Sequence, residues 1–132
     1  MTAKTILNLD KIAAERAQKI VEQTNDAKTL ERLATKTLGV LQEQGVYACM
    51  LFLFSRSSDE AKAAPVIRAQ LFQALVALPA FDRAPDDDDD AQTALSFFSD
   101  HVLNDLDLML LVHDLYEQTL IYARYGAKAA GG

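Results

Sequence analysis

Hydrophobic residues recur at intervals of three and four along most of this chain, and no other sequence feature constrains its fold as strongly. From Leu9 to Glu22 the spacing is that of an amphipathic helix. A second helix follows the capping residues Asn25 and Asp26. It is predicted to end at Gly45, because glycine readily adopts the backbone conformations that terminate helices. This periodicity favours a bundle of helices.

The stretch from Val46 to Phe54 is almost entirely hydrophobic, so its composition fits either a strand or a buried helix. The rest of the chain offers no partner strand. An isolated strand would leave its backbone donors and acceptors unpaired. We therefore predict a central, buried helix over residues 46–56.

Residues 57–59, Ser-Ser-Asp, offer caps for a fourth helix, which has Pro65 in its first turns and ends before Pro79. The following segment, 79–90, contains two prolines and the run Asp86 to Asp90. Because neighbouring carboxylates repel one another, this segment is predicted to be a mobile acidic loop.

Two more helices are expected after the loop, at about 91–103 and 106–127, the second stopped by the Gly and Ala tail. Half of the 132 residues are hydrophobic and only 24% are charged, which is typical of a folded domain. The sequence therefore predicts an all-α fold, a single domain spanning 1–132 with about six helices.

No hydrophobic run approaches the roughly 18 to 20 residues of a membrane-spanning helix, and Met1 to Asp10 lacks the core of a signal peptide. We therefore expect a cytoplasmic protein. The single cysteine, Cys49, cannot form an internal disulfide and lies in a hydrophobic stretch, so we expect a buried thiol.

The net charge of −6 is distributed unevenly. Residues 1–84 hold eleven Lys and Arg against nine Asp and Glu, whereas residues 85–132 hold two against ten. The first part therefore carries +2 and the second −8. An acidic average argues against a nucleic-acid partner, but here the acidity is confined to the C-terminal third.

The two histidines are the first candidates for a metal or acid–base site. His101 has Asp105 four residues later and His113 has Glu117 four residues later, so each pair could lie on one helix face. The Glu-x-x-His pairs of di-iron bundles are absent. We expect ordinary surface or hydrogen-bonded histidines and predict no metal.

Other signatures of chemistry are also missing. The run Asp86 to Asp90 lacks the alternating ligands, the glycine and the glutamate of a calcium loop, so a solvated loop is favoured over a regulatory surface or a cation site. There is no phosphate-binding glycine loop, cysteine pair or nucleophile elbow. We predict no catalytic activity, no cofactor and no small-molecule substrate.

Basic residues form two candidate patches. One set could project from the polar faces of the first two helices and the end of the third: Lys11, Arg16, Lys19, Lys28, Arg32, Lys36 and Arg56. A second set lies in the last helix: Tyr122, Arg124, Tyr125 and Lys128. Such sets could bind phosphates, but from the sequence an ordinary mixed, solvated helix face is favoured for the first and packing for the second.

The segment from Leu33 to Arg56 resembles the central signature of the Cmr-type small subunit of type III-B CRISPR effector complexes. In that family a helix bearing a basic residue runs into a glycine, and a hydrophobic helix ending in Phe-x-x-Ser-like residues follows. Ala17 to Glu22 resembles the first helix of the family, and Tyr122 to Lys128 resembles its aromatic and basic closing helix. The order and spacing match over most of the chain.

The resemblance implies a non-catalytic six-helix bundle that stacks with copies of itself into a short filament beside the subunits that carry the guide RNA. Its basic face would line the channel for guide and target RNA and contact phosphates, because base pairing already reads the sequence. The expected partners are other subunits of the complex, copies of the chain, and the RNA backbone. The residues that the resemblance implies for RNA binding are Lys19, Lys36, Arg56, Arg124 and Lys128, with Arg16 and Arg32 behind them.

Two other functions remain open from the sequence. In one, the chain is an acidic helical adaptor or chaperone-like module whose C-terminal third binds a basic protein, without RNA. In the other, a metal-dependent enzyme would use His101 and His113, which the ligand spacing disfavours.

Overall fold

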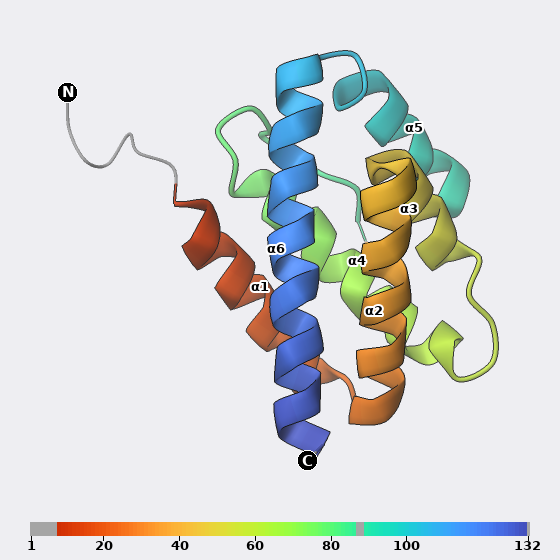
Figure 1. Cartoon of the computed structure of the whole chain (residues 1–132). Coiled ribbons are helices and arrows are strands. Elements are labelled where there is room, and N and C mark those ends of the chain that lie inside the picture. Colours follow the sequence, from red (N-terminus) through yellow and green to blue (C-terminus); the bar gives the residue numbers. More distant parts are fainter. Residues whose placement is uncertain (1–7, 87–88, 132) are drawn as a thin grey trace.

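The computed structural model describes residues 8–86 and 89–131, and within these ranges it contains six α-helices and no strand. The helices are α1 (Leu9–Gln23), α2 (Ala27–Gln44), α3 (Val46–Phe54), α4 (Glu60–Val76), α5 (Ala91–His101) and α6 (Leu106–Gly131) (Figure 1). The predicted all-α fold in a single domain is therefore confirmed. Asp87 and Asp88 of the predicted acidic loop lie outside the described residues.

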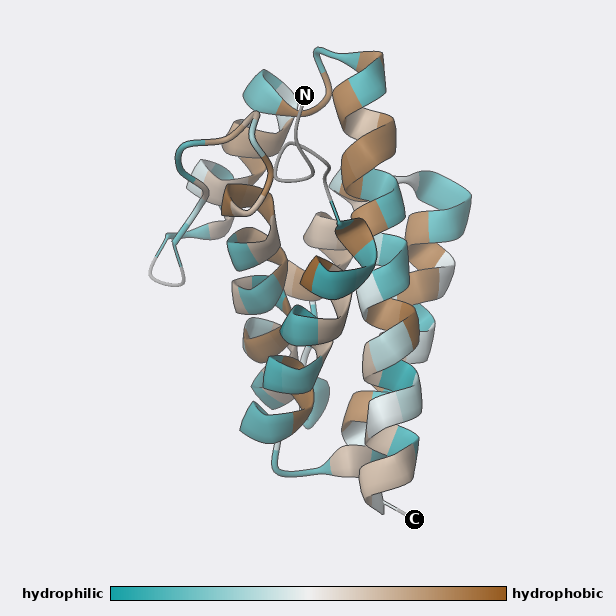
Figure 2. Cartoon of the chain, turned by 90° about the vertical axis from the view of Figure 1, so that its left-hand side faces the viewer, coloured by the Kyte–Doolittle hydropathy of each residue, from teal (hydrophilic) through white to brown (hydrophobic). Residues whose placement is uncertain are grey.

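The longest helix, α6, runs the length of the bundle and packs mainly against α1 and α2 (Figure 1). Behind it, α4 packs against α1, α2 and α3. The short helix α3 turns back from the end of α2 and contacts α4, α5 and α6. Most of the helices carry both polar and hydrophobic residues (Figure 2), and the residues buried between them are mostly hydrophobic.

The core lies where α2, α3, α4 and α6 meet. Its fully buried members include Leu33, Leu41, Met50, Leu53, Ile67 and Leu71. Phe98 attaches α5 to this core, since its ring centroid lies 6.3 Å from that of Phe72 and 6.4 Å from that of Tyr116. The buried Tyr116 hydroxyl donates a hydrogen bond of 3.0 Å to the Leu71 carbonyl oxygen, so this polar group has a partner inside the core.

The hydrophobic stretch after Gly45 is a helix, as predicted, but it ends at Phe54 and is buried on one side only. Cys49 and Leu53 are fully buried, whereas Leu51 is 48% exposed. Cys49 is a free, buried cysteine, as predicted, and burial raises the pKa of its thiol to about 12.

Other helix ends also differ from the prediction, and α5 ends at His101 instead of about residue 103. Asp59 stands at the N-cap of α4 but makes no side-chain capping bond there. The closing helix continues past Ala127 to Gly131. It does so because alanines favour helix, and because this last turn packs against the start of α2: a Cβ at Gly131 would lie 3.2 Å from the Ala27 Cβ.

The acidic segment has no regular structure over its described residues, 79–86 and 89–90. It is nevertheless attached to the bundle, because Phe81 is buried and its ring lies 5.8 Å from that of Phe97. Asp90, the last aspartate of the run, caps α5 by accepting a hydrogen bond of 2.8 Å from the Thr93 amide. At least this carboxylate therefore has a structural role.

Gly45 joins α2 to α3 in a conformation that other residues rarely adopt, with φ +97° and ψ −174°. We expect Gly45→Ala to lower the free energy of unfolding by about 1–3 kcal/mol, because the strain lies in the backbone and not in a clash. Urea denaturation measures this effect. Gly39→Ala is the matched control: Gly39 is helical with open space around it, so alanine there should raise stability by up to about 1 kcal/mol.

Candidate nucleic-acid interface

Three of the seven predicted RNA-binding residues meet around one carboxylate. Arg32 and Lys36 lie one turn apart on α2, and Arg56 follows the end of α3. All three reach Glu60 in the first turn of α4. We call Arg32, Lys36, Arg56 and Glu60 the Glu60 cluster.

Within the Glu60 cluster the Lys36 contact has the length of a charge-assisted hydrogen bond, and the two arginine contacts are longer. Glu60 Oε2 lies 2.9 Å from Lys36 Nζ and 3.3 Å from Arg32 Nε, and Oε1 lies 3.3 Å from Arg56 Nη1. Three cations thus surround one anion, which leaves a local charge of +2. The cluster is electropositive although the whole chain is acidic.

Arg56 is the most firmly held cation of the cluster. Its Nε donates to the Phe52 carbonyl oxygen at 3.0 Å, and its Nη2 donates to Ser55 Oγ at 3.0 Å. The guanidinium also lies 3.7 Å from the centre of the Phe52 ring, within the range of a cation–π contact. These contacts lock the side chain at the carboxyl end of α3, where the helix dipole favours a positive charge.

Burial differs between the anion and the cations. The Glu60 side chain is 10% exposed, whereas the side chains of Arg32 and Lys36 are 50% and 49% exposed. The hydrogen bond from Lys36, with further ones from Arg32 and Arg56, holds the pKa of Glu60 below its ordinary value, against the opposing effect of burial. Glu60 is therefore an ionised anchor, and half of each α2 cation faces solvent.

Glu60 should make stability depend on pH. Because its pKa is lower in the folded state, its contribution is present at neutral pH and is lost as the pH falls below about 4.5, through the folded-state pKa. We expect Glu60→Gln to lower the urea midpoint at pH 7, and the difference from wild type to shrink as the pH falls through the folded-state pKa of Glu60. Asp59→Asn, at the neighbouring uncapped position, is the control; an equal pH-dependent loss there would contradict this assignment.

The predicted residues of α1 lie outside the Glu60 cluster. Arg16 donates from Nη1 to Gln70 Oε1 of α4 at 2.9 Å, so it links two helices of the bundle. Lys19 lies 3.7 Å from Glu22 on the exposed face of α1. Such exposed pairs on a single helix are weak, so Lys19 can exchange Glu22 for another anion.

The predicted residues of α6 form no ion pair with the cluster within the described ranges. The Arg124 guanidinium lies 5.3 Å from the centre of the Tyr125 ring, and Lys128 is exposed near the end of the helix. Tyr122, counted in the same patch, instead donates its hydroxyl hydrogen to Asp10 of α1. Tyr122 therefore links α6 to α1 through a hydrogen bond.

Sequence reasoning missed Glu60 and Arg68. Arg56 and Glu60 are four residues apart, which could have indicated a pair, but the intervening Ser-Ser-Asp turn concealed it. Arg68 of α4 donates to the Leu53 carbonyl oxygen at 3.2 Å, and its guanidinium lies 4.2 Å from the centre of the Phe54 ring. Arg56 and Arg68 therefore both cover the last turn of α3.

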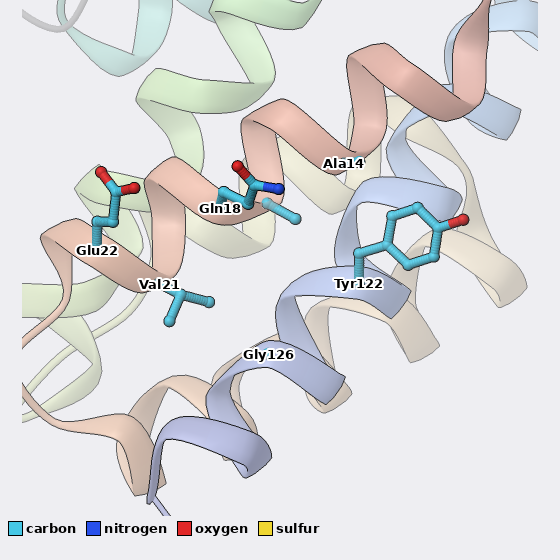
Figure 3. Close-up of a pocket in the computed structure, with 7 residues that line it drawn as sticks. Ala14, Gln18, Val21, Glu22, Tyr122 and Gly126 are labelled. Atoms are coloured by element: carbon cyan, nitrogen blue, oxygen red, sulfur yellow. The ribbon is translucent and has the colours of Figure 1, made fainter.

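A groove of about 500 Å³ lies between α1 and α6 (Figure 3). Its lining is mostly small or hydrophobic: Ala14, Ala17, Gln18, Val21, Glu22, Tyr122 and Gly126. Val21 points toward α6 beside Gly126, where a Cβ would come within 3.0 Å of Val21 Cγ2 (Figure 3). The glycine thus allows the two helices to approach closely.

The two histidines differ in their surroundings. His101 ends α5 and packs against Phe97, with ring centroids 4.9 Å apart and ring planes tilted by 47°. Asp105 lies beyond that helix and accepts a hydrogen bond from the Leu108 amide at the start of α6, so the two do not share a helix face. His113 and Glu117 do share α6, and the His113 ring is hydrogen-bonded to the Leu41 carbonyl oxygen at 3.2 Å.

Comparisons with known proteins yield no relative: no family model matches the chain, and no curated protein or solved structure is significantly similar to it. Among the described residues, none of the helices combines the length and hydrophobicity needed to cross a bilayer.

Proposed function

We propose that this chain is the small helical subunit of a type III-B CRISPR effector complex, in which it stacks with its own copies and contacts the backbone of guide and target RNA without catalysing a reaction. The Glu60 cluster is the observation that carries this proposal. It brings together Arg32, Lys36 and Arg56. Lys36 and Arg56 lie within the segment Leu33 to Arg56, whose sequence resembles the central signature of that family, and Arg32 immediately precedes it.

The geometry of the cluster suits phosphate binding. Glu60 occupies the buried side of the three cations and pre-organises them, so less side-chain entropy is lost when an RNA phosphate binds. The exposed halves of Arg32 and Lys36 can then contact that phosphate from the solvent side. Such contacts position a strand without reading its bases.

The distribution of hydrophobic and acidic residues supports stacking. Leu103, Leu106 and Leu110 are 37%, 64% and 51% exposed, and we call them the leucine patch. The sequence has no Lys or Arg from residue 84 to residue 123, so the leucine patch lies in a strongly acidic region. An acidic surface with a hydrophobic centre complements the part of a second copy formed by residues 1–84, which carries a net charge of +2, and this would give a head-to-tail, open assembly.

The leucine patch also favours the second candidate function. In an adaptor, a protein with a basic rim and a hydrophobic centre would bind there, and the Glu60 cluster would serve only to join α2, α3 and α4. The first function therefore depends on the Glu60 cluster for its contact with RNA, whereas the second depends on the leucine patch for its contact with a protein.

The decisive experiment is purification of the tagged chain from its native host, with sequencing of the small RNA and mass spectrometry of the proteins that accompany it. We expect guide RNAs to co-purify together with the backbone subunits of a CRISPR effector complex. Each complex should contain several copies of this chain. A single basic protein without RNA would refute the proposal and identify the adaptor.

A further inference from the structure

His113, Asp114 and Glu117 form a cluster of potential metal ligands on α6. Each offers one ligand atom, and these atoms all lie within 4.8 Å of one another. Ligand atoms bound to one tetrahedral ion at 2.0–2.2 Å are roughly 3.3–3.5 Å apart. Small side-chain rotations are therefore enough to bring the three onto one ion.

The contact between His113 and α2 fixes which ring nitrogen can bind a metal. Nε2 lies 3.2 Å from the Leu41 carbonyl oxygen, and a carbonyl oxygen only accepts hydrogen bonds, so Nε2 carries the hydrogen. In the neutral ring the lone pair then belongs to Nδ1, which lies 3.9 Å from Asp114 Oδ1. The free nitrogen is thus on the side of a carboxylate.

Glu117, like His113, is held by a residue of α2. Its Oε2 accepts a hydrogen bond of 2.9 Å from Gln42 Nε2, and Gln42 is the residue next to Leu41. Two consecutive residues of α2 therefore hold two candidate ligands of α6, an arrangement that resembles the outer-sphere hydrogen bonds around metal ligands in proteins. Both residues lie in the last turn of α2, where the helix dipole adds partial negative charge.

We propose that His113 Nδ1 and the carboxylates of Asp114 and Glu117 bind one divalent transition-metal ion such as Zn²⁺. The imidazole ligand favours Zn²⁺, Co²⁺ or Ni²⁺ over Mg²⁺ and Ca²⁺, which prefer oxygen ligands. Three protein ligands leave a fourth position for water on the partly exposed surface. This inference is independent of the proposed RNA-binding function, because it uses none of the cations assigned to RNA.

The test is isothermal titration of the untagged, full-length chain with ZnCl₂, together with the same titration using MgCl₂. We expect saturable binding of one Zn²⁺ per chain and no comparable binding of Mg²⁺. His113→Asn should abolish it, and Asp114→Asn and Glu117→Gln should each weaken it at least about tenfold. Gln42→Leu, on the other helix, should weaken it about tenfold, which a site in an unfolded chain would not show.

His101→Asn is the matched control, since it removes the other histidine and should leave Zn²⁺ binding unchanged. The nitrogen chemical shifts of the His113 ring provide a second measurement on the wild-type protein, in case a variant fails to fold. We expect Zn²⁺ to change the chemical shift of Nδ1, whereas the shift of Nε2 should remain that of a protonated nitrogen. Absence of saturable binding, equal binding by His113→Asn, or a shift at His101 instead would overturn the proposal.

Discussion

Reversing both exposed cations of the Glu60 cluster, Arg32→Glu with Lys36→Glu, should lower the affinity of the assembled complex for single-stranded RNA about 100-fold at roughly 0.1 M salt. The double variant removes two phosphate contacts per copy and places two carboxylates where the RNA backbone would lie. The slope of log affinity against log salt should also become shallower by about one to two units. Fluorescence anisotropy with labelled RNA at several salt concentrations measures both quantities.

A matched reversal separates the site from the overall charge. Lys62→Glu with Arg83→Glu changes the net charge by the same amount at two exposed positions outside both candidate basic patches. We expect it to weaken binding only slightly. An equal loss in both double variants would show that only the general charge matters, and no loss in either would refute RNA binding at the cluster. Arg32→Gln with Lys36→Gln, which spares Glu60 the added repulsion, should give an intermediate affinity.

The fold was predictable because helix formation is a local property. Spacings of three and four placed α1 and α2, and Gly45 separated α2 from α3 through its positive φ. The end of α6 was not predictable to the residue, since its last turn depends on contact with Ala27, about a hundred positions earlier in the sequence. Tertiary packing thus extended a helix that local signals would have ended.

The candidate site was predictable only in part. The four-residue spacing of Arg32 and Lys36 put both on one helix face, and the structure brings them together. Their shared partner Glu60 lies 28 and 24 residues away, and periodicity does not tell which neighbour a polar face meets. For the same reason, Arg16 looked like a free surface cation in the sequence but lies against Gln70 of α4 in the structure.

Phe98→Ala should have the largest effect on stability. The Phe98 side chain is fully buried among Phe72, Phe97 and Tyr116, and α5 has few other large residues in the core. Deleting the ring should lower the free energy of unfolding by about 3–5 kcal/mol through lost burial and the cavity that remains. Urea denaturation followed by circular dichroism measures this loss, and Leu110→Ala, at a position 51% exposed, is the control and should change stability by at most about 0.5 kcal/mol.

The urea dependence of this variant also distinguishes two ways of losing α5. If the bundle unfolds as one unit, the midpoint should fall while the slope m stays that of the wild type, since the same surface is exposed on unfolding. If α5 instead detaches while the other helices stay folded, m should decrease, because less surface remains to be exposed. We expect the first result, because Phe98 touches rings from both α4 and α6 and so couples α5 to the centre of the core. A loss below about 1 kcal/mol would contradict the assigned packing.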